Sequence, residues 1–326
     1  MIKKEKIDVS QDLVSTLEFD KVLNLLAENL ICQDTQESIE SWVYPMKDVE
    51  DINLEIKYEL DLDGLLQSYG QLPISPFRFL KDEVDKLAIE NYILNIDQIL
   101  NIRSIIVSIH GVIRYFNKDR KREYPHFYSL VNQIVENKVL EKAVTQYLDE
   151  KGNIFENATP ELKKIHQTIS KTQKELDSTF NSVLLEYKKS GILADTEESI
   201  RNGRRVFCVA ANYKYKVKGI LHDESKNGHV AYIEPDRVIL VNNRLFDLEN
   251  EKKREEYRII SMICNDLREY RNEISNYESR LIQIDILQAK AKFAQSYAGI
   301  APEVLSEPCI NLEESFHPLL LLKNKI

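Results

Sequence analysis

Apolar residues recur at steps of three and four along two long stretches of this 326-residue chain, and a short stretch of alternating residues separates them. The first long stretch begins at Thr159-Pro160, where threonine can cap a helix and proline is tolerated at the first helical position. It predicts one helix about 45 Å long that ends at residues 189–191. Its apolar or near-apolar positions are Leu162, Ile165, Ile169, Thr172, Leu176, Phe180, Val183 and Tyr187.

The second long stretch predicts a return helix over residues 237–298, about 90 Å long at the usual rise per residue. An apolar seam this long would be exposed to water on an isolated helix, so we expect the two helices to pack antiparallel. The alternative is two unrelated helices in a globular bundle. The heptad seam consists of Ile263, Leu267, Tyr270, Ile274, Tyr277, Leu281 and Ile284, and small residues continue it at Ala289, Ala291, Ala294 and Ala298.

The residues between the two helices, 192–236, predict a small antiparallel sheet carried at the end of a helical arm. Residues 206–210 alternate like a buried strand, and residues 213–218 alternate Tyr, Tyr and Val with three lysines. The second pattern predicts a strand that is apolar on one face and cationic on the other. Asn227-Gly228 favours a tight turn, and the next strand, 229–233, ends at Glu234-Pro235.

The rest of the chain predicts helices. Residues 1–158 read as a helical domain in which Asp48 caps one helix, and residues 299–326 follow the return helix. Trp42 and Tyr44 are interpreted as core or domain-contact aromatics rather than as a platform for stacking bases. The predicted fold is therefore mainly α, with a small β insertion.

Composition agrees with this organisation. Only 9 Gly and 9 Pro occur, which favours long helices with few turns. The four cysteines are far apart and form no CxxC pair, which argues against structural zinc and fits a reducing cytoplasm. The N-terminus has no apolar signal region, and no apolar run approaches the roughly 18 residues of a membrane helix. We expect a cytoplasmic protein that does not enter a membrane.

Charge points to one candidate binding surface. The formal net charge of −9 argues against nucleic-acid binding over the whole surface but leaves room for a local basic patch. Such cations suit contacts to nucleic-acid phosphates, and lysines on an exposed strand also protect it from aggregation; the residues leave both readings open. Residues 201–218 contain no acidic residue and six cations: Arg201, Arg204, Arg205, Lys214, Lys216 and Lys218.

No catalytic or metal-binding motif emerges from the residues. His222 and His229, with Asp223 and Glu224, are interpreted as a polar hairpin loop rather than a metal site, because their spacing does not fix converging ligands. No glycine is followed by lysine, so the chain lacks the Gly-x4-Gly-Lys-Ser/Thr loop that cradles nucleotide phosphates. We expect no catalytic residue, no metal and no cofactor in this chain.

Several short motifs occur in a characteristic order along the chain. They are Leu17 to Ala27, Ile200-Arg-Asn-Gly-Arg-Arg-Val206, Gly219-Ile-Leu-His-Asp-Glu-Ser225, Tyr232-Ile-Glu-Pro235, Val241-Asn-Asn243 and Phe316-His-Pro-Leu-Leu320. With these motifs the chain resembles the MutS family over essentially its whole length, and specifically the second subfamily, which lacks the N-terminal mismatch-reading domain.

The resemblance implies a role for each part. Residues 1–158 resemble the helical core domain, 159–191 and 237–298 the ascending and descending helices of an antiparallel coiled-coil lever, and 192–236 the β clamp at its tip. Residues 299–326 resemble the linker to an ATPase domain, which in relatives binds ATP and Mg. The chain stops at Ile326, before a phosphate loop would occur, so we expect a truncated product.

These expectations combine into one leading hypothesis. The chain is a noncatalytic core–lever–clamp segment whose clamp cations bind DNA, with a role in repair or recombination, and full-length relatives are homodimers. One alternative ligand is ribosomal RNA in ribosome rescue. A different class of function is a structural arm whose strands contact another protein chain.

Overall fold

A computed structural model describes residues 11–37, 39, 48–80, 82–307 and 309–323. The chain divides into two compact units: residues 1–146, 150–152 and 263–326 form the first, and residues 147–149 and 153–262 form the second. The described residues are mainly helical and include one four-stranded antiparallel sheet, which confirms the predicted fold class at that level. Trp42 and Tyr44 lie outside the described residues.

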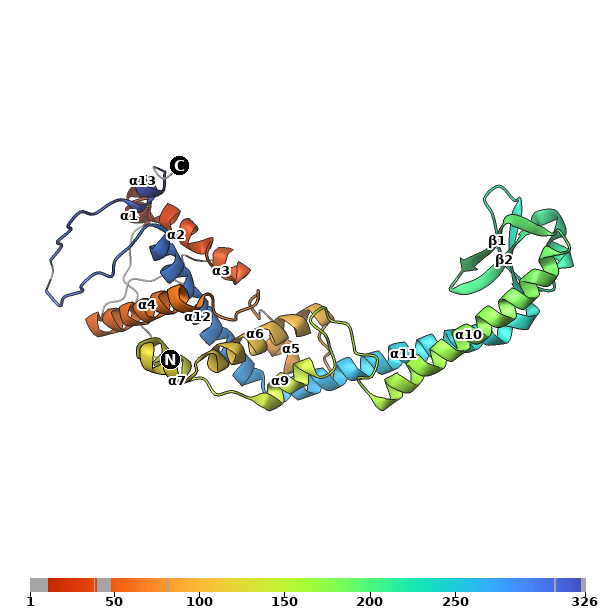
Figure 1. Cartoon of the computed structure of the whole chain (residues 1–326), viewed down its shortest axis with the longest axis horizontal. Helices are drawn as coiled ribbons and strands as arrows, with labels where there is room; N and C mark the ends of the chain where they lie inside the picture. The colour runs from red at the N-terminus through yellow and green to blue at the C-terminus, as the bar shows by residue number, and fades with distance from the viewer. Residues whose placement is uncertain (1–10, 38, 40–47, 81, 308, 324–326) are drawn as a thin grey trace. The chain divides into compact units, whose positions relative to one another are not determined.

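The first unit is built around α12 (Arg271–Ser296), which packs against α2, α4, α5 and α6 (Figure 1). Tyr277, Leu281 and Ile284 of α12 are buried there because neighbouring helices cover them. The other helices of this unit are α1 (Gln11–Thr16), α2 (Phe19–Ala27), α3 (Gln33–Glu37), α4 (Val49–Tyr69), α5 (Glu83–Leu87), α6 (Ile96–Tyr115), α7 (Lys118–Glu123), α8 (Pro125–Val131), α9 (Lys138–Thr145) and α13 (Pro318–Lys323).

The predicted return helix is two helices. α11 (Asp236–Glu269) ends before Tyr270, whose φ of −106° and ψ of 14° leave the helical region, and α12 begins at Arg271. The heptad seam predicted for pairing with the preceding helix falls in the first unit, from Ile263 onward. Its apolar residues therefore serve a multi-helix core, which requires the same spacing as a coiled coil.

One helix of the first unit, α6, is long and apolar enough to cross a membrane, and it is the only such helix in the described ranges. Its mean hydropathy reaches 1.3 over an 18-residue window. Ile99, Ile102, Ile105 and Ile109 are nevertheless fully buried within the protein. These contacts are those of a core helix, which passes the same length and composition test.

The second unit contains α10 (Pro160–Lys188), and its capped start confirms the prediction: the Thr159 hydroxyl accepts a hydrogen bond from the Leu162 N–H at 3.1 Å. Three ion pairs connect α10 to α11. From one pair to the next, the residue number rises along α10 and falls along α11, so the two helices are antiparallel. These pairs are Arg258–Glu161 at 3.9 Å, Arg244–Glu175 at 3.0 Å and Arg237–Glu186 at 2.7 Å.

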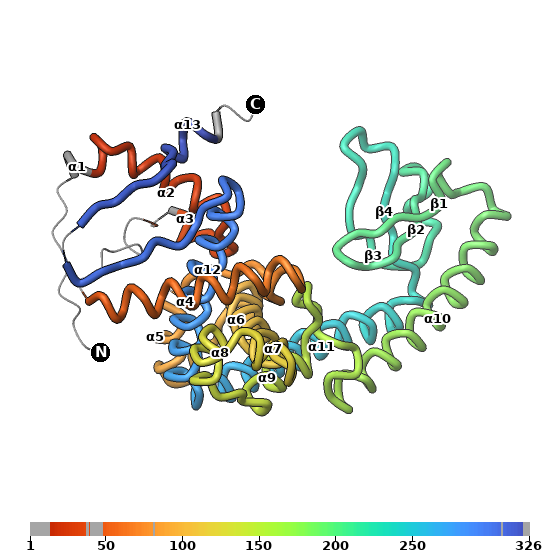
Figure 2. Tube along the Cα trace, turned by 60° about the vertical axis from the view of Figure 1, so that its left-hand side comes forward, coloured from red at the N-terminus to blue at the C-terminus, as the bar shows by residue number. Residues whose placement is uncertain are grey.

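The sheet of the second unit lies beside one end of α10 (Figure 2). Its strands are β1 (Leu193–Arg201), β2 (Arg204–Ala210), β3 (Gly219–Glu224) and β4 (Val230–Pro235), in the order β1-β2-β4-β3. Its core includes Phe180 of α10 and Phe207 of β2, whose ring centroids are 4.6 Å apart. Val183, Val209 and Val238 belong to the same cluster, so the sheet and both helix ends share one core.

The prediction of a strand over residues 213–218 is wrong. Residues 211–216 form a 3-10 helix, η2 (Ala211–Lys216). β2 and β3 both pair antiparallel with β4, which lies between them, so they run parallel to each other. The connecting residues must therefore return along the sheet instead of extending it, and Tyr213 and Val217 pack against the core while they do so.

The start of β3 is a close backbone approach that only glycine fits. A Cβ atom on Gly219 would lie 2.1 Å from the backbone oxygen of Glu234. We expect Gly219→Ala to lower the free energy of unfolding by about 2 kcal/mol, because the β3–β4 pairing must open to admit the methyl group. Urea unfolding with hydrogen exchange at β3 measures this. Ile220→Ala, at a half-exposed neighbour, is the control, and equal losses in both variants would contradict the expectation.

Candidate nucleic-acid interface

The three candidate arginines lie on the β1–β2 hairpin. Asn202 and Gly203 form its turn with φ values of 51° and 74°, a conformation that asparagine tolerates and glycine adopts freely. Arg201 and Arg204 are direct partners across the hairpin. Each of the three side chains is then held by a different set of neighbours.

Arg204 belongs to a polar cluster that we define as Arg204, His222, Glu234 and Asn242. Glu234 is fully buried at its centre. Its carboxylate accepts a hydrogen bond from Arg204 Nη1 at 2.9 Å and one from Asn242 Nδ2 at 2.8 Å, and it contacts His222 Nε2 at 2.6 Å. A buried carboxylate needs such partners to be stable, so Arg204 has a structural role as the cation that pairs with Glu234.

Arg205 and Arg201 are also engaged. Arg205 forms ion pairs with Asp177 of α10 and with Glu198 of β1, both at 2.7 Å, and its guanidinium lies 4.1 Å from the centroid of the Phe180 ring. Arg201 stacks at 3.8 Å on the Tyr232 ring and lies 4.0 Å from Asp223. The basic run in the sequence is thus largely neutralised in space by acidic residues from elsewhere in the chain.

The lysines differ from one another. Lys214 of η2 forms an ion pair with Glu224 at 2.8 Å, and this hydrogen bond and charge raise the pKa of Lys214. Lys216 and Lys218 are exposed, and no carboxylate of the described residues lies within the 4.0 Å ion-pair distance of either ammonium. Tyr215 lies between Lys214 and Lys216 in η2 and is 91% exposed. The Lys216 ammonium lies 4.7 Å from the centroid of the Tyr213 ring. Residues 215–218 therefore present two cations without a carboxylate partner among the described residues, and one aromatic ring, to solvent.

Among the residues that the structure describes, no group of converging metal ligands includes His222 or His229. His222 contacts Glu234, and His229 is exposed in the β3–β4 connection. The one group of suitable ligands in the described part of the chain is His110, Glu136 and Glu141 in the first unit. Arg114 forms ion pairs with both glutamates, and although burial opposes it, hydrogen bonds from Arg114 and His110 hold the pKa of Glu141 below its usual value. The arginine already supplies the positive charge that a metal would bring.

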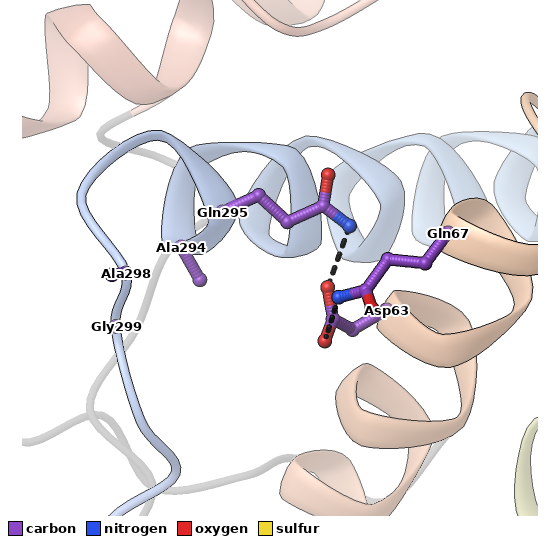
Figure 3. A pocket seen from close by; sticks show the side chains of 6 residues that line it. All are labelled: Asp63, Gln67, Ala294, Gln295, Ala298 and Gly299. Carbon is purple, nitrogen blue, oxygen red and sulfur yellow. Dashed lines mark hydrogen bonds between the residues drawn. The ribbon is translucent and has the colours of Figure 1, made fainter.

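A pocket of about 380 Å³ in the first unit offers little chemistry (Figure 3). Its one charged lining residue is Asp63, and the remainder of the lining is glutamine, alanine and glycine. Both Asp63 oxygens accept hydrogen bonds from glutamine amides, from Gln295 at 2.6 Å and from Gln67 at 3.0 Å. Asp63 is the only lining residue that can ionise, and glutamine amides bind both of its oxygens.

The polar cluster was not predicted from the sequence, although its members come from the motifs that carry the family resemblance. Arg204, His222, Glu234 and Asn242 belong to four separate motifs, at 200–206, 219–225, 232–235 and 241–243. Their common centre on Glu234 indicates that the motifs specify how the sheet is assembled. One feature of the sequence could have indicated a buried carboxylate here: Glu234 lies directly before the proline that ends a strand and directly after the apolar Ile233.

The fold thus defines a mainly helical protein with a small sheet beside one end of an antiparallel helix pair. The chain is similar over nearly its whole length to bacterial proteins named Endonuclease MutS2. It is 24% identical to the one from Halothermothrix orenii over 322 residues, covering 97% of this chain and 40% of the relative. It is 26% identical over 314 residues to the one from Lactobacillus acidophilus, covering 96% of this chain and 40% of the relative.

A third relative, from Caldanaerobacter subterraneus, is 27% identical over 308 residues. These similarities support membership of the MutS family. No protein-family model matches the chain. The chain spans about two fifths of the length of these relatives.

Proposed function

We propose that this chain is a noncatalytic segment of a MutS-like protein and binds DNA beside its sheet, through the segment that connects β2 to β3, with Lys216, Lys218 and Tyr215 as the contacting residues. The observation that carries the proposal is that Lys216 and Lys218 are exposed and have no carboxylate partner among the described residues, next to a tyrosine that is 91% exposed. The lysines would neutralise phosphates, and the ring would pack against a sugar or base. Similarity to the Endonuclease MutS2 proteins supports this class of ligand.

In this proposal the helix pair acts as the lever and the sheet as the clamp of the MutS architecture. Arg201, Arg204, Arg205 and Lys214 hold the clamp together, with Lys214 able to exchange Glu224 for a phosphate. We expect no ATP hydrolysis, because the chain has no Gly-x4-Gly-Lys-Ser/Thr loop. ATP and Mg would act in another domain of the whole protein, which we expect to be a cytoplasmic homodimer.

The test is fluorescence anisotropy with a labelled DNA duplex over a range of salt concentrations. Lys216→Glu with Lys218→Glu should weaken binding at least tenfold and reduce the salt slope by about 2, since each phosphate contact contributes about −0.9. Tyr215→Ala should weaken binding with the slope unchanged. The control, Lys57→Glu with Lys138→Glu in the first unit, changes net charge equally. Unchanged affinity in the sheet variant would rule out these contacts.

A second candidate function is docking to another protein chain. The edge strands β1 and β3 expose Ile200 at 69% and Ile220 at 49%, and an exposed sheet edge can pair with a partner strand. Concentration-dependent association that is insensitive to salt, without DNA binding, would favour it. A competing RNA duplex that displaces DNA at equal concentration would instead favour ribosomal RNA as the ligand.

A further inference from the structure

We propose that the solvent-facing side of α10 is a second phosphate-binding surface, formed by the lysine row Lys163, Lys164, Lys171 and Lys174, that contacts the backbone of a nucleic-acid duplex. It extends the proposed nucleic-acid function to a helix that the proposed sheet contact does not use. The row lies outside the basic run at residues 201–218, because its four lysines belong to a helix and are brought together by the helical repeat.

The geometry of α10 brings the four lysines together. At 3.6 residues per turn they fall within an arc of about 100°, opposite the apolar side formed by Leu162, Ile165 and Ile169. All four are exposed, and the residues between them on this face, Gln167 and Ser170, are polar. The row is about 17 Å long at the helical rise of about 1.5 Å per residue.

The row also lacks counter-charges. Residues 163–174 contain no acidic residue, in a chain with 53 acidic and 44 basic residues. No carboxylate of the described residues lies within the 4.0 Å ion-pair distance of these ammonium groups. The acidic residues that border the row on α10 are turned to other partners: Glu161 to Arg258, Glu175 to Arg244 and Asp177 to Arg205.

The ordinary alternative is a solvated helix face. Such faces commonly mix both signs of charge, as α11 does over residues 249–256, where four glutamates flank three cations. α10 departs from that pattern because its carboxylates pair with arginines of α11 and β2 and leave the lysines uncompensated. A single-sign row in an acidic protein is the arrangement expected of a site for a linear polyanion.

A duplex matches the row better than other anionic surfaces do. Phosphates along one strand rise by about 3.4 Å each, so the row is as long as about five of them. Lysine binds phosphate as a point charge and reads no sequence, so this contact would not depend on base sequence. A membrane-surface helix would need apolar residues beside its lysines, and this face of α10 has none between positions 163 and 174.

The experiment replaces the whole row with glutamine, which preserves helix propensity. Binding of the full chain to a labelled DNA duplex is measured between about 50 and 200 mM KCl, where the dependence on phosphate contacts is steep. We expect the Lys163→Gln, Lys164→Gln, Lys171→Gln, Lys174→Gln variant to reduce the salt slope by about 3 to 4. Circular dichroism checks that α10 is retained.

The matched control is Lys57→Gln, Lys138→Gln, Lys142→Gln, Lys253→Gln, which changes net charge equally at four exposed positions outside the row. The proposal is overturned if the row variant keeps the wild-type slope, or if the control loses as much as the row variant. Binding of anionic phospholipid vesicles that depends on the row, without binding of DNA, would also overturn it.

The sheet variant separates this proposal from the proposed function. If Lys216→Glu with Lys218→Glu binds DNA as the wild type does while the row variant loses its slope, the sheet contact fails and the row stands. If only the sheet variant loses affinity, the row fails. An RNA duplex measured in parallel identifies which nucleic acid supplies the phosphates, and losses that combine in the joint variant show that one ligand contacts both surfaces.

Discussion

Glu234→Ala should destabilise the sheet of the second unit by about 3–5 kcal/mol, the range seen when one partner of a buried ion pair is removed. Glu234 is fully buried, and its removal leaves Arg204, whose side chain is 22% exposed, without its carboxylate partner. His222 and Asn242 lose the same partner at once. Hydrogen exchange in β2 and β4, together with urea unfolding, measures the loss.

Two further variants test the cause. Arg204→Met alone should cost a similar amount, because it leaves a buried carboxylate without its cation, whereas Arg204→Met combined with Glu234→Leu should recover much of the loss. Glu224→Ala removes an exposed ion pair with Lys214 and should cost less than about 1 kcal/mol. A double variant as unstable as either single variant would show that the loss does not come from leaving one buried charge unpaired.

The polar cluster joins four motifs that lie apart along the chain. β2, β3 and α11 each contribute one partner to Glu234 of β4, so the carboxylate joins segments that are up to 38 positions apart. A buried ionic centre of this kind tolerates few alternative strand arrangements, since each leaves a charge without its partners. The family resemblance of this region therefore reflects assembly of the sheet, and its ligand contacts have to be sought among other residues.

The sequence predicted correctly those elements in which the local residue pattern and the packing in the folded chain favour the same structure. The cap at Thr159, proline at the first helical position and the threes and fours of α10 all point to the helix that forms. β2 and β4 were predicted from short runs of mostly apolar residues bounded by turn signals, and these residues are largely buried in the sheet. β1 was missed because Asp195, Glu197 and Glu198 give it the composition of a loop, although charges are common on edge strands.

The errors arose where tertiary context outweighs local pattern. Alternating tyrosine and lysine over residues 213–218 suits a strand, but the order β1-β2-β4-β3 requires the chain to return along the sheet there. The six candidate cations appeared to have no counter-ions because Asp177, Glu224 and Glu234 lie outside the basic run. Ion pairing between distant segments is not visible in a sequence pattern, and it decides which cations remain available to a ligand.

Stability of the first unit should depend on pH through Asp285. Its side chain is fully buried on α12 and accepts hydrogen bonds from the backbone N–H groups of Ile31, at 3.0 Å, and Cys32, at 2.9 Å. Burial raises the pKa of Asp285 from 3.8 to about 6, and the two backbone hydrogen bonds and the charge of Lys292 only partly oppose it. The folded state therefore holds this proton more tightly than the unfolded chain does.

The sign of the effect follows from that difference. Below pH 3.8 both states are protonated and the group contributes no pH dependence; as the pH rises toward 6, ionisation favours the unfolded chain. The resulting loss is about 3 kcal/mol, and it is complete above the folded-state pKa. Asp285→Asn cannot ionise, so the unfolding free energy of the wild type should fall relative to that of the variant by this amount over the same interval.

Urea unfolding of both proteins at closely spaced pH values measures this difference and cancels the titrations that they share. Asp119→Asn, at an exposed position of α7, is the charge-matched control. A constant difference between wild type and Asp285→Asn from pH 4 to 7 would show that Asp285 ionises as easily in the fold as in the unfolded chain. The two backbone amides would then compensate fully for its burial, as they do at well-solvated helix caps.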